Sequence, residues 1–303
     1  MRVLITGMNG FVGRVLADYA RREKKARVYA FEGDVRESRD VEKALRRVRP
    51  DRVFHLAAQS FVPRAMSHPE ETFLTNTLGA LHLFSGIHAQ GLTKTRIHVA
   101  GSAYEYGRVA AKDLPIREEQ PLKPADPYAV SKVAQDRLAE AYHRHFGVHV
   151  VRTRAFSHIG PGQKEQFAVS SFARQIAMIE AGLAKPVLRV GNLEAVRDFT
   201  DVRDVVRAYW LALERGRAGE VYNVARGKGY KLGAILGILL GLSRADIRVE
   251  TDRKRLRRDD IAFVVGDGRK FRRATGWKPE IPIRRTLGDV LDHWRKEIAS
   301  RKI

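Results

Sequence analysis

The sequence predicts an α/β fold, with a doubly wound, mainly parallel sheet followed by a smaller mixed α/β domain. Two observations favour this class. Short apolar segments typical of buried strands alternate with segments of helical character through the first half of the chain, joined by short loops. A glycine-rich turn also stands between the first strand and the first helix. Because the alternation weakens after about residue 160, we expect residues 1–160, with a return segment at about 193–226, to form the first domain, and residues 161–303 to form most of the second.

The first strand, residues 3–6, leads directly into the glycine-rich turn and then into a helix that runs to Arg22. Glycines in this arrangement permit a tight turn, close approach of backbone N–H groups to a pyrophosphate, and tight packing of helix on strand. The N-terminus of the helix adds partial positive charge. This is the pattern of a Rossmann-type domain, and we expect the cofactor phosphates to lie against Gly7, Asn9, Gly10, Phe11, Val12 and Gly13.

The next strands end in residues suited to the rest of a dinucleotide. A second strand, residues 27–31, ends at Glu32, about twenty residues after the glycines, where a carboxylate usually holds an adenosine ribose. A helix over residues 38–49 and a strand over 52–56 follow, and small residues after that strand let a cofactor approach the backbone. Another helix opens at Asn76 and runs to about residue 90. The cofactor residues expected in this part of the chain are Glu32, Asp34, Val35, Leu56, Ala57, Ala58 and Asn76.

A reactive tyrosine is predicted in the first turn of a later helix. Asp126-Pro127 marks the start of that helix, so Tyr128 and Lys132 lie one turn apart on the same face. We expect the ammonium to lower the pKa of the phenol from about 10 toward the working pH. Such a tyrosine can exchange a proton with a sugar hydroxyl or carbonyl, and Ser102, after the strand over 96–100, can hydrogen-bond the same oxygen. We therefore expect Ser102, Tyr128 and Lys132 to be the catalytic set.

Taken together, these motifs resemble the extended short-chain dehydrogenase/reductase family, which acts on nucleotide sugars. The segments 154–163, 190–204 and 222–224 are similar to those of GDP-6-deoxy-4-keto-mannose reductases and GDP-mannose 4,6-dehydratases. The resemblance implies that Arg197 and Arg257 grip a sugar-nucleotide diphosphate, a task for which a bidentate guanidinium is suited. It also implies substrate contacts from Ser157 and Asn192, cofactor contacts from Tyr128 and Lys132, and a homodimer formed through helices near 78–90 and 128–146.

One departure from the family pattern bears on the reaction. The dehydratases carry a glutamate, three residues before the glycine of the Ser102 motif, that removes the C5 proton of the sugar. This chain has Tyr104 at that place and Glu105 one position later. Without a carboxylate there, elimination of water lacks its base, which favours plain reduction unless Glu105 turns inward.

A second departure lies near the start of the chain. Only 27 positions separate Gly7 from Asp34, about twenty fewer than the family typically has, so one βα unit is missing. If residues 27–31 serve as the second strand of the pattern, Glu32 meets the adenosine ribose and NADH is favoured. If they serve as the third, Asp34 or Val35 lies by the adenine. The choice between NAD(H) and NADP(H) stays open at this point.

Composition limits the other possibilities. The 303 residues include no cysteine, which excludes disulfides, thiolate metal sites and a cysteine nucleophile, and no histidine pair has metal spacing, so no metal is expected. No apolar run reaches the length of a membrane span and the strand pattern begins at once, so a cytoplasmic location is expected. The net charge is +21, but Lys and Arg are scattered along the chain, which suits anionic metabolites better than nucleic acid.

The sequence therefore supports three hypotheses. The first is reduction, by NAD(P)H, of the C4 ketone of a GDP-4-keto-6-deoxy-hexose to a GDP-6-deoxy-hexose such as GDP-rhamnose. The second, in the same fold, is a 4,6-dehydratase acting on GDP-mannose, or a 4-epimerase, with retained NAD(P). The third is an inactive relative that binds RNA through its basic surface.

Overall fold

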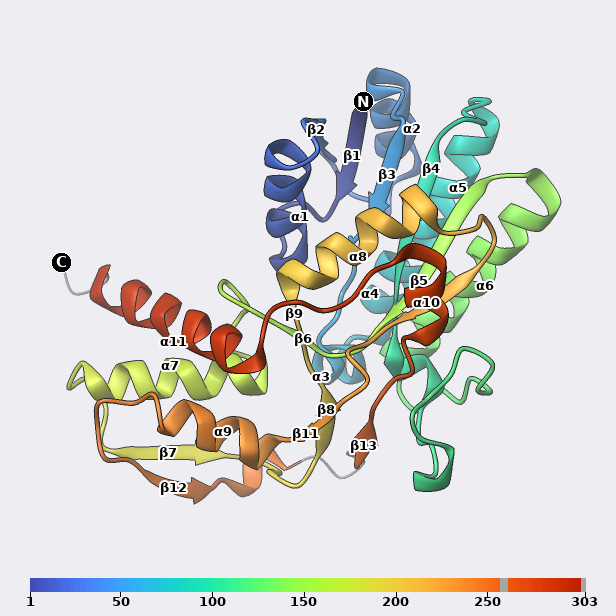
Figure 1. Cartoon of the computed structure of the whole chain (residues 1–303). Helices are drawn as coiled ribbons and strands as arrows, with labels where there is room; N and C mark the ends of the chain where they lie inside the picture. The colour runs from blue at the N-terminus through green and yellow to red at the C-terminus, as the bar shows by residue number, and fades with distance from the viewer. Residues whose placement is uncertain (257–260, 301–303) are drawn as a thin grey trace.

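The computed structural model describes residues 1–256 and 261–300, and its centre is a six-stranded parallel sheet (Figure 1). The strand order is β10-β5-β4-β3-β1-β2, in which every neighbouring pair is parallel. The strands are β1 Arg2–Thr6, β2 Arg27–Ala30, β3 Arg52–His55, β4 Arg96–Ser102, β5 His149–Ala155 and β10 Val221–Val224. This order and direction confirm the predicted doubly wound α/β class.

Helices cover both faces of the central sheet. Leu16, Phe54 and Trp210 belong to a core between the sheet and one layer of helices, formed by α1 (Phe11–Arg22), α8 (Val202–Arg215) and the short α10 (Arg269–Thr275). Leu45, Phe84 and Val150 belong to the core on the other face, under α2 (Ser38–Val48), α5 (Gly79–Ala89) and α6 (Pro127–Phe146). Both sheet faces are therefore dry, as a parallel sheet requires.

The position of β2 decides between the two alternatives for residues 27–31. Strand β2 pairs with β1, with Ile5 opposite Ala30, so it occupies the place of a second strand. In the usual order 3-2-1-4-5-6, the outermost position would be filled by a third strand. No strand among the described residues pairs with the outer edge of β2, which is where the shortened chain loses its βα unit.

A separate core, which we call the second core, lies beyond the carboxyl ends of the strands, apart from the core on each face of the sheet (Figure 1). Three helices, α7 (Ala168–Glu180), α9 (Leu232–Leu240) and α11 (Ile283–Ser300), pack their apolar faces together there. The strands of this part form small separate sheets. They are β7 (Val187–Val190) with β12 (Arg248–Thr251), β8 (Val196–Asp198) between β11 (Gly229–Lys231) and β13 (Phe263–Val264), and β6 (His158–Ile159) with β9 (Thr200–Asp201).

Short helical turns complete the chain. They are α3 (Val62–Ser67), α4 (Pro69–Phe73), the π-helix η1 (Leu74–Leu78), and the 3₁₀ turns η2 (Ala103–Tyr106), η3 (Ala111–Asp113) and η4 (Arg253–Arg255). Among the described residues, no helix is both long and apolar enough to cross a bilayer.

Candidate active site

A cavity of about 670 Å³ lies between the carboxyl ends of the central strands and the second core. Ligands of doubly wound sheets bind at this edge, and the volume is typical of a small-molecule site. Many of the residues singled out from the sequence line it: Gly7, Gly10, Phe11, Val12, Gly13, Leu56, Ala58, Ser102, Tyr128, Lys132, Ser157, Asn192 and Arg197. Asn9, Glu32, Asp34, Val35, Ala57 and Asn76 are not part of this lining. Arg257 lies outside the described residues.

The glycine-rich turn forms one end of the cavity. Gly7 has a φ of +70°, and a Cβ built on it would come within 2.8 Å of the backbone nitrogen of Ala57. A Cβ on Gly13 would lie 2.3 Å from the carbonyl oxygen of Gly7. Gly10 caps α1 without a side chain, and the first turn of the helix carries no acidic residue. The first N–H groups of α1 are thus available to an anion, and the turn fits the diphosphate of a dinucleotide.

The residues after β2 are paired among themselves. The Glu32 carboxylate accepts a hydrogen bond of 3.0 Å from Arg47 and is mostly exposed. Asp34 accepts bonds of 2.8 and 3.0 Å from the Nε atom of Arg36, and this guanidinium lowers the pKa of Asp34. Val35 is buried against Gly79 of α5, where an added Cβ would come within 2.9 Å of a methyl group of Val35. Contact of these residues with an adenosine stays a prediction.

Helix α6 begins as the sequence indicates. The side chain of Asp126 accepts a hydrogen bond of 2.9 Å from the N–H group of Ala129, and Pro127 occupies the first turn. Tyr128 and Lys132 lie one turn apart, both buried and both lining the cavity. The Nζ atom of Lys132 donates a hydrogen bond of 2.6 Å to the Oε1 atom of Gln135.

The predicted direction of the Tyr128 pKa shift is wrong for the unliganded protein. Burial raises the pKa of Tyr128 above its ordinary value of 10, and the hydrogen bond with the Ser102 side chain offsets this only in part. Burial also lowers the pKa of Lys132 to about 8. In each case desolvation is the largest cause, because burial disfavours the charged form of the group. Tyr128 is therefore a neutral phenol at neutral pH and can donate a proton.

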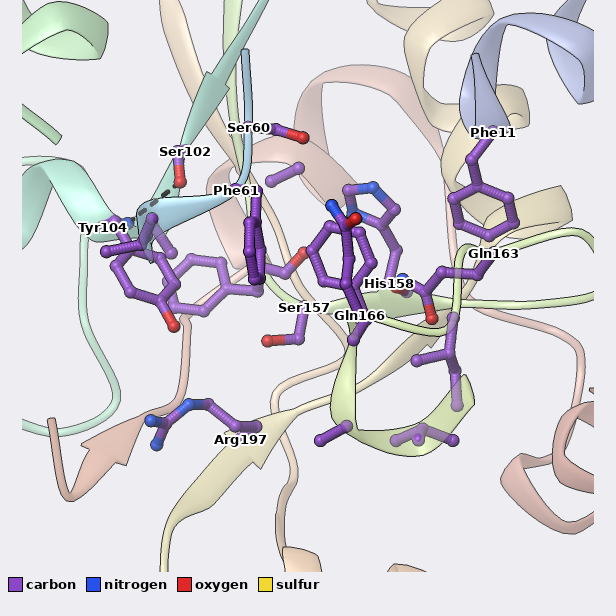
Figure 2. Close-up of a pocket in the computed structure, with 18 of the residues that line it drawn as sticks. Phe11, Ser60, Phe61, Ser102, Tyr104, Ser157, His158, Gln163, Gln166 and Arg197 are labelled. Atoms are coloured by element: carbon purple, nitrogen blue, oxygen red, sulfur yellow. Dashed lines mark hydrogen bonds between the residues drawn. The ribbon is translucent and has the colours of Figure 1, made fainter. Parts of the chain in front are cut away.

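Ser102 ends β4 and caps the 3₁₀ turn that follows. Its Oγ atom accepts a hydrogen bond of 3.2 Å from the backbone N–H of Tyr104 (Figure 2). The Glu105 carboxylate accepts one of 2.7 Å from the N–H of Ser102. The ring of Tyr104 packs edge-to-face on Tyr128, with centroids 6.4 Å apart. Tyr104 lines the cavity, whereas Glu105 does not.

Glu105 is fully buried behind the serine. Its Oε2 atom accepts a hydrogen bond of 2.9 Å from Nε of Arg154, whose Nη2 atom donates another of 2.9 Å to Asp136 on α6. Burial, followed by the charge of Asp136, raises the pKa of Glu105. Since both of its oxygens accept hydrogen bonds, one of them from a guanidinium, the geometry fits a carboxylate. Glu105 has not turned inward to serve as a base.

The other end of the cavity is basic and aromatic. Figure 2 shows Arg197 across the cavity from Ser102 and Tyr104. Lys254 and Arg255 of η4 also line this end, and sequence reasoning missed them. The signal that could have found them is the dense basic run at 253–258.

Two aromatic pairs in the cavity wall also escaped sequence reasoning. Phe11 stacks on His158, and Phe61 meets Phe167 edge-to-face, each pair with centroids 6.1 Å apart. The members of each pair lie 106 or more positions apart in the chain, so no local pattern predicts them.

The fold and the site define a class. A glycine-rich turn at a helix N-terminus and a buried serine, tyrosine and lysine facing one cavity are the parts of a Rossmann-fold oxidoreductase of the short-chain dehydrogenase/reductase type. The family model described as GDP-mannose 4,6 dehydratase matches residues 19–290, and the chain belongs to this family.

Individual relatives agree with this assignment. The chain is 37% identical to GDP-6-deoxy-D-mannose reductase from Pseudomonas aeruginosa, and the match covers 98% of each chain. Among solved structures, it is similar to that of RMD from Pseudomonas aeruginosa complexed with NADPH, with a TM-score of 0.92, 37% identity, and coverage of 98% of this chain and 99% of the other. It also matches UDP-glucose 4-epimerase from Thermus thermophilus in complex with NAD, with a TM-score of 0.87, 27% identity, and coverage of 97% and 99%.

Proposed function

We propose that this protein reduces the C4 ketone of a GDP-4-keto-6-deoxy-hexose to the alcohol at the expense of NAD(P)H, giving a GDP-6-deoxy-hexose such as GDP-rhamnose. One observation carries the proposal: Ser102, Tyr128 and Lys132 face a cavity that has a phosphate-binding glycine turn at one end and Arg197 at the other. The 37% identity to a GDP-6-deoxy-D-mannose reductase supports the choice of substrate.

The chain's own residues supply orientation and proton transfer. Ser102 donates a hydrogen bond to the ketone oxygen and polarises the carbonyl. Tyr128 gives its phenolic proton to that oxygen, and the Lys132 ammonium stabilises the phenolate left behind. When bound, the reduced nicotinamide supplies the hydride that completes the new C–H bond. One hydride and one proton convert the ketone to the secondary alcohol, so the reaction is balanced.

The substrate diphosphate needs cationic partners at the far end. We propose that Arg197 provides one of them, with Ser157 and Asn192 beside it. Lys254 and Arg255 lie in the same part of the lining and supply further positive charge. The glycine turn and the N-terminus of α1 hold the cofactor diphosphate, so the two anionic ligands meet at the ketone.

The decisive variant is Tyr128→Phe, which keeps the ring and removes the proton donor. Loss of a general acid usually lowers the rate about 10²–10⁴-fold. The assay follows NAD(P)H absorbance with a GDP-4-keto-6-deoxy-hexose, and NADPH binding, measured by fluorescence, should change little. Undiminished consumption of the ketosugar by the variant would end the proposal.

A dehydratase is the second candidate, because the matching family model carries that description. The position of Glu105 counts against it, since the carboxylate is held by Ser102 and Arg154 behind the cavity. Incubation with GDP-mannose and no added cofactor separates the two. A 4-keto-6-deoxy product would identify a dehydratase, whereas a reductase should leave GDP-mannose unchanged.

We also propose that the protein is a homodimer and works in the cytoplasm. The family resemblance supports the dimer, because it implies contact through the helices near 78–90 and 128–146, where α5 and α6 lie. NAD(P)H, which the proposed reaction consumes, is available in the cytoplasm. Sedimentation at micromolar concentration tests the oligomeric state.

A further inference from the structure

The ammonium of Lys132 has a buried partner that the proposed mechanism does not use. Gln135 lies on α6 three residues after Lys132, is 1% exposed, and accepts the 2.6 Å hydrogen bond from Nζ through its Oε1 atom. The amide nitrogen of Gln135 is buried and has no hydrogen-bond partner among the described residues. The amide thus leaves its own N–H groups unsatisfied while its oxygen faces the lysine. Reversing it would set donors against an ammonium that can only donate.

Among the described residues, Gln135 supplies the neutral acceptor for this amine, and ionisable groups from several elements surround it. Those that face Lys132 or its neighbours are Glu105 of η2, His55 of β3, His98 of β4, Arg154 of β5, Tyr128 and Asp136 of α6, and Tyr209 of α8.

Among these groups Glu105 is the one whose negative charge acts on Lys132, and its oxygens are held by Ser102 and Arg154. His55 and His98 are neutral, because burial lowers the pKa of each to about 3. The acceptor that the structure shows for the ammonium is the Gln135 amide, which comes from α6 itself.

We infer that Gln135 is a positioning residue, which fixes the Lys132 ammonium one helical turn from Tyr128 and keeps it charged for ketone reduction. This inference rests on the proposed function. Its physical basis is that a buried ammonium without an acceptor either loses its proton or moves toward water. In both cases the phenolate formed at Tyr128 loses the cation that stabilises it.

Two substitutions at this position test the inference. Gln135→Met keeps the length of the side chain and removes the acceptor, while Gln135→Glu keeps an oxygen facing the amine. The first readout is the titration of the Lys132 ammonium by NMR in protein labelled with ¹⁵N-lysine, without cofactor or substrate, and Lys132→Met identifies the signal. Gln135→Met should lower the titration midpoint by about one to two pH units, since a hydrogen bond to a charged group is worth about that much. Gln135→Glu should leave the midpoint at or above the wild-type value.

The second readout is kinetic. With Gln135→Met, kcat at neutral pH should fall about tenfold for each pH unit by which the ammonium midpoint drops below the assay pH, with KM for the ketosugar little changed. The fall in rate at alkaline pH should begin correspondingly earlier. Gln175→Met on α7 is the matched control, because the Gln175 amide bonds the backbone of Arg189 in the second core and is not part of the cavity lining. It should change neither readout.

The outcomes separate this inference from the proposed function. If Gln135→Met leaves the midpoint unmoved, or if both substitutions lower it equally, Gln135 only fills space and the inference is wrong. Thermal melting shows whether a variant is folded, and the more conservative Gln135→Glu keeps the comparison available. If wild-type protein fails to reduce the ketosugar, the proposed function fails, while the NMR titration still reports on Gln135.

Discussion

A buried ion-pair network joins the 3₁₀ turn after Ser102 to helix α6. Removing its arginine tests how much this network stabilises the site. Arg154 of β5 donates to Glu105 behind Ser102 and to Asp136 on α6, both at 2.9 Å. The perturbation is Arg154→Met, which keeps most of the side-chain volume and removes the charge. Among the described residues, the Glu105 carboxylate then keeps only the backbone N–H of Ser102 as a hydrogen-bond donor, and it remains fully buried.

The expected loss of stability is large, because the substitution leaves the buried Glu105 carboxylate without its cationic partner. Removing one partner of a buried pair costs about 3–5 kcal/mol, whereas replacing both partners by groups of similar volume is often close to neutral. Arg154→Met should therefore destabilise the protein by about 3–5 kcal/mol. Adding Glu105→Gln to it should recover part of this loss, with a coupling energy of about 2 kcal/mol. Since whole proteins are stable by about 5–15 kcal/mol, the single variant should still fold.

Urea unfolding at neutral pH, followed by circular dichroism, measures the free energy of unfolding of Arg154→Met, of Glu105→Gln and of the double variant. Arg295→Met is the comparison, because Arg295 of α11 pairs with Glu180 of α7, and these side chains are 21% and 9% exposed, against 4% and 0% for Arg154 and Glu105. It should cost less, because water can reach the carboxylate that is left without a partner. A loss for Arg154→Met no greater than that for Arg295→Met, or strict additivity with Glu105→Gln, would show that the pair does not carry charge in the folded protein.

Two further predictions concern the sheet and the glycine turn. Burial lowers the pKa of His55 and His98 from 6.5 to about 3, so the unfolded chain takes up protons first and stability is lost as the pH falls from 6.5 toward 3. Each histidine should lower the free energy of unfolding by about 1.4 kcal/mol per pH unit, so the two together should lower it by about 5 kcal/mol at about pH 4.5. Urea midpoints that do not move with acid would refute this. Gly13→Ala should weaken NADPH binding, measured by fluorescence titration, by about tenfold or more, because its Cβ would lie 2.3 Å from a backbone carbonyl oxygen. Gly237→Ala is the control and should leave the titration unchanged, because a Cβ there has no atom within 4 Å.

Local signals explain which parts of the site the sequence could predict. The glycine turn, the start of α6 at Asp126 and the four-residue spacing of Tyr128 and Lys132 all depend on near neighbours. Ser102 joins them because the carboxyl ends of parallel strands meet at one edge of the sheet. A strand-and-helix pattern is enough to bring these residues together.

Burial and long-range pairing explain what could not be predicted. The pKa of Tyr128 was expected to fall because the sequence shows the nearby lysine, but it does not show how completely the fold excludes water from both groups. Strands β7 and β12 have four residues each and pair across about sixty intervening positions, so neither has a strong pattern alone. The role of Glu105 behind Ser102 likewise depends on Arg154, which is 49 residues away.

The first domain can still bind a dinucleotide although it lacks one βα unit, because the missing unit would lie at the edge of the sheet. Strand β1 still pairs with β3, with Thr6 opposite His55, and this pairing sets Gly7 against the backbone of Ala57. The phosphates of a dinucleotide bind at the first βα turn, where the strand order reverses, and need neither the third strand nor its helix. We expect only the adenosine end to reach toward β2, where the exposed Glu32 carboxylate pairs with Arg47. The missing unit therefore affects the surroundings expected for the adenosine, whereas the glycine turn between β1 and β3 and the end of β4 that carries Ser102 both line the cavity.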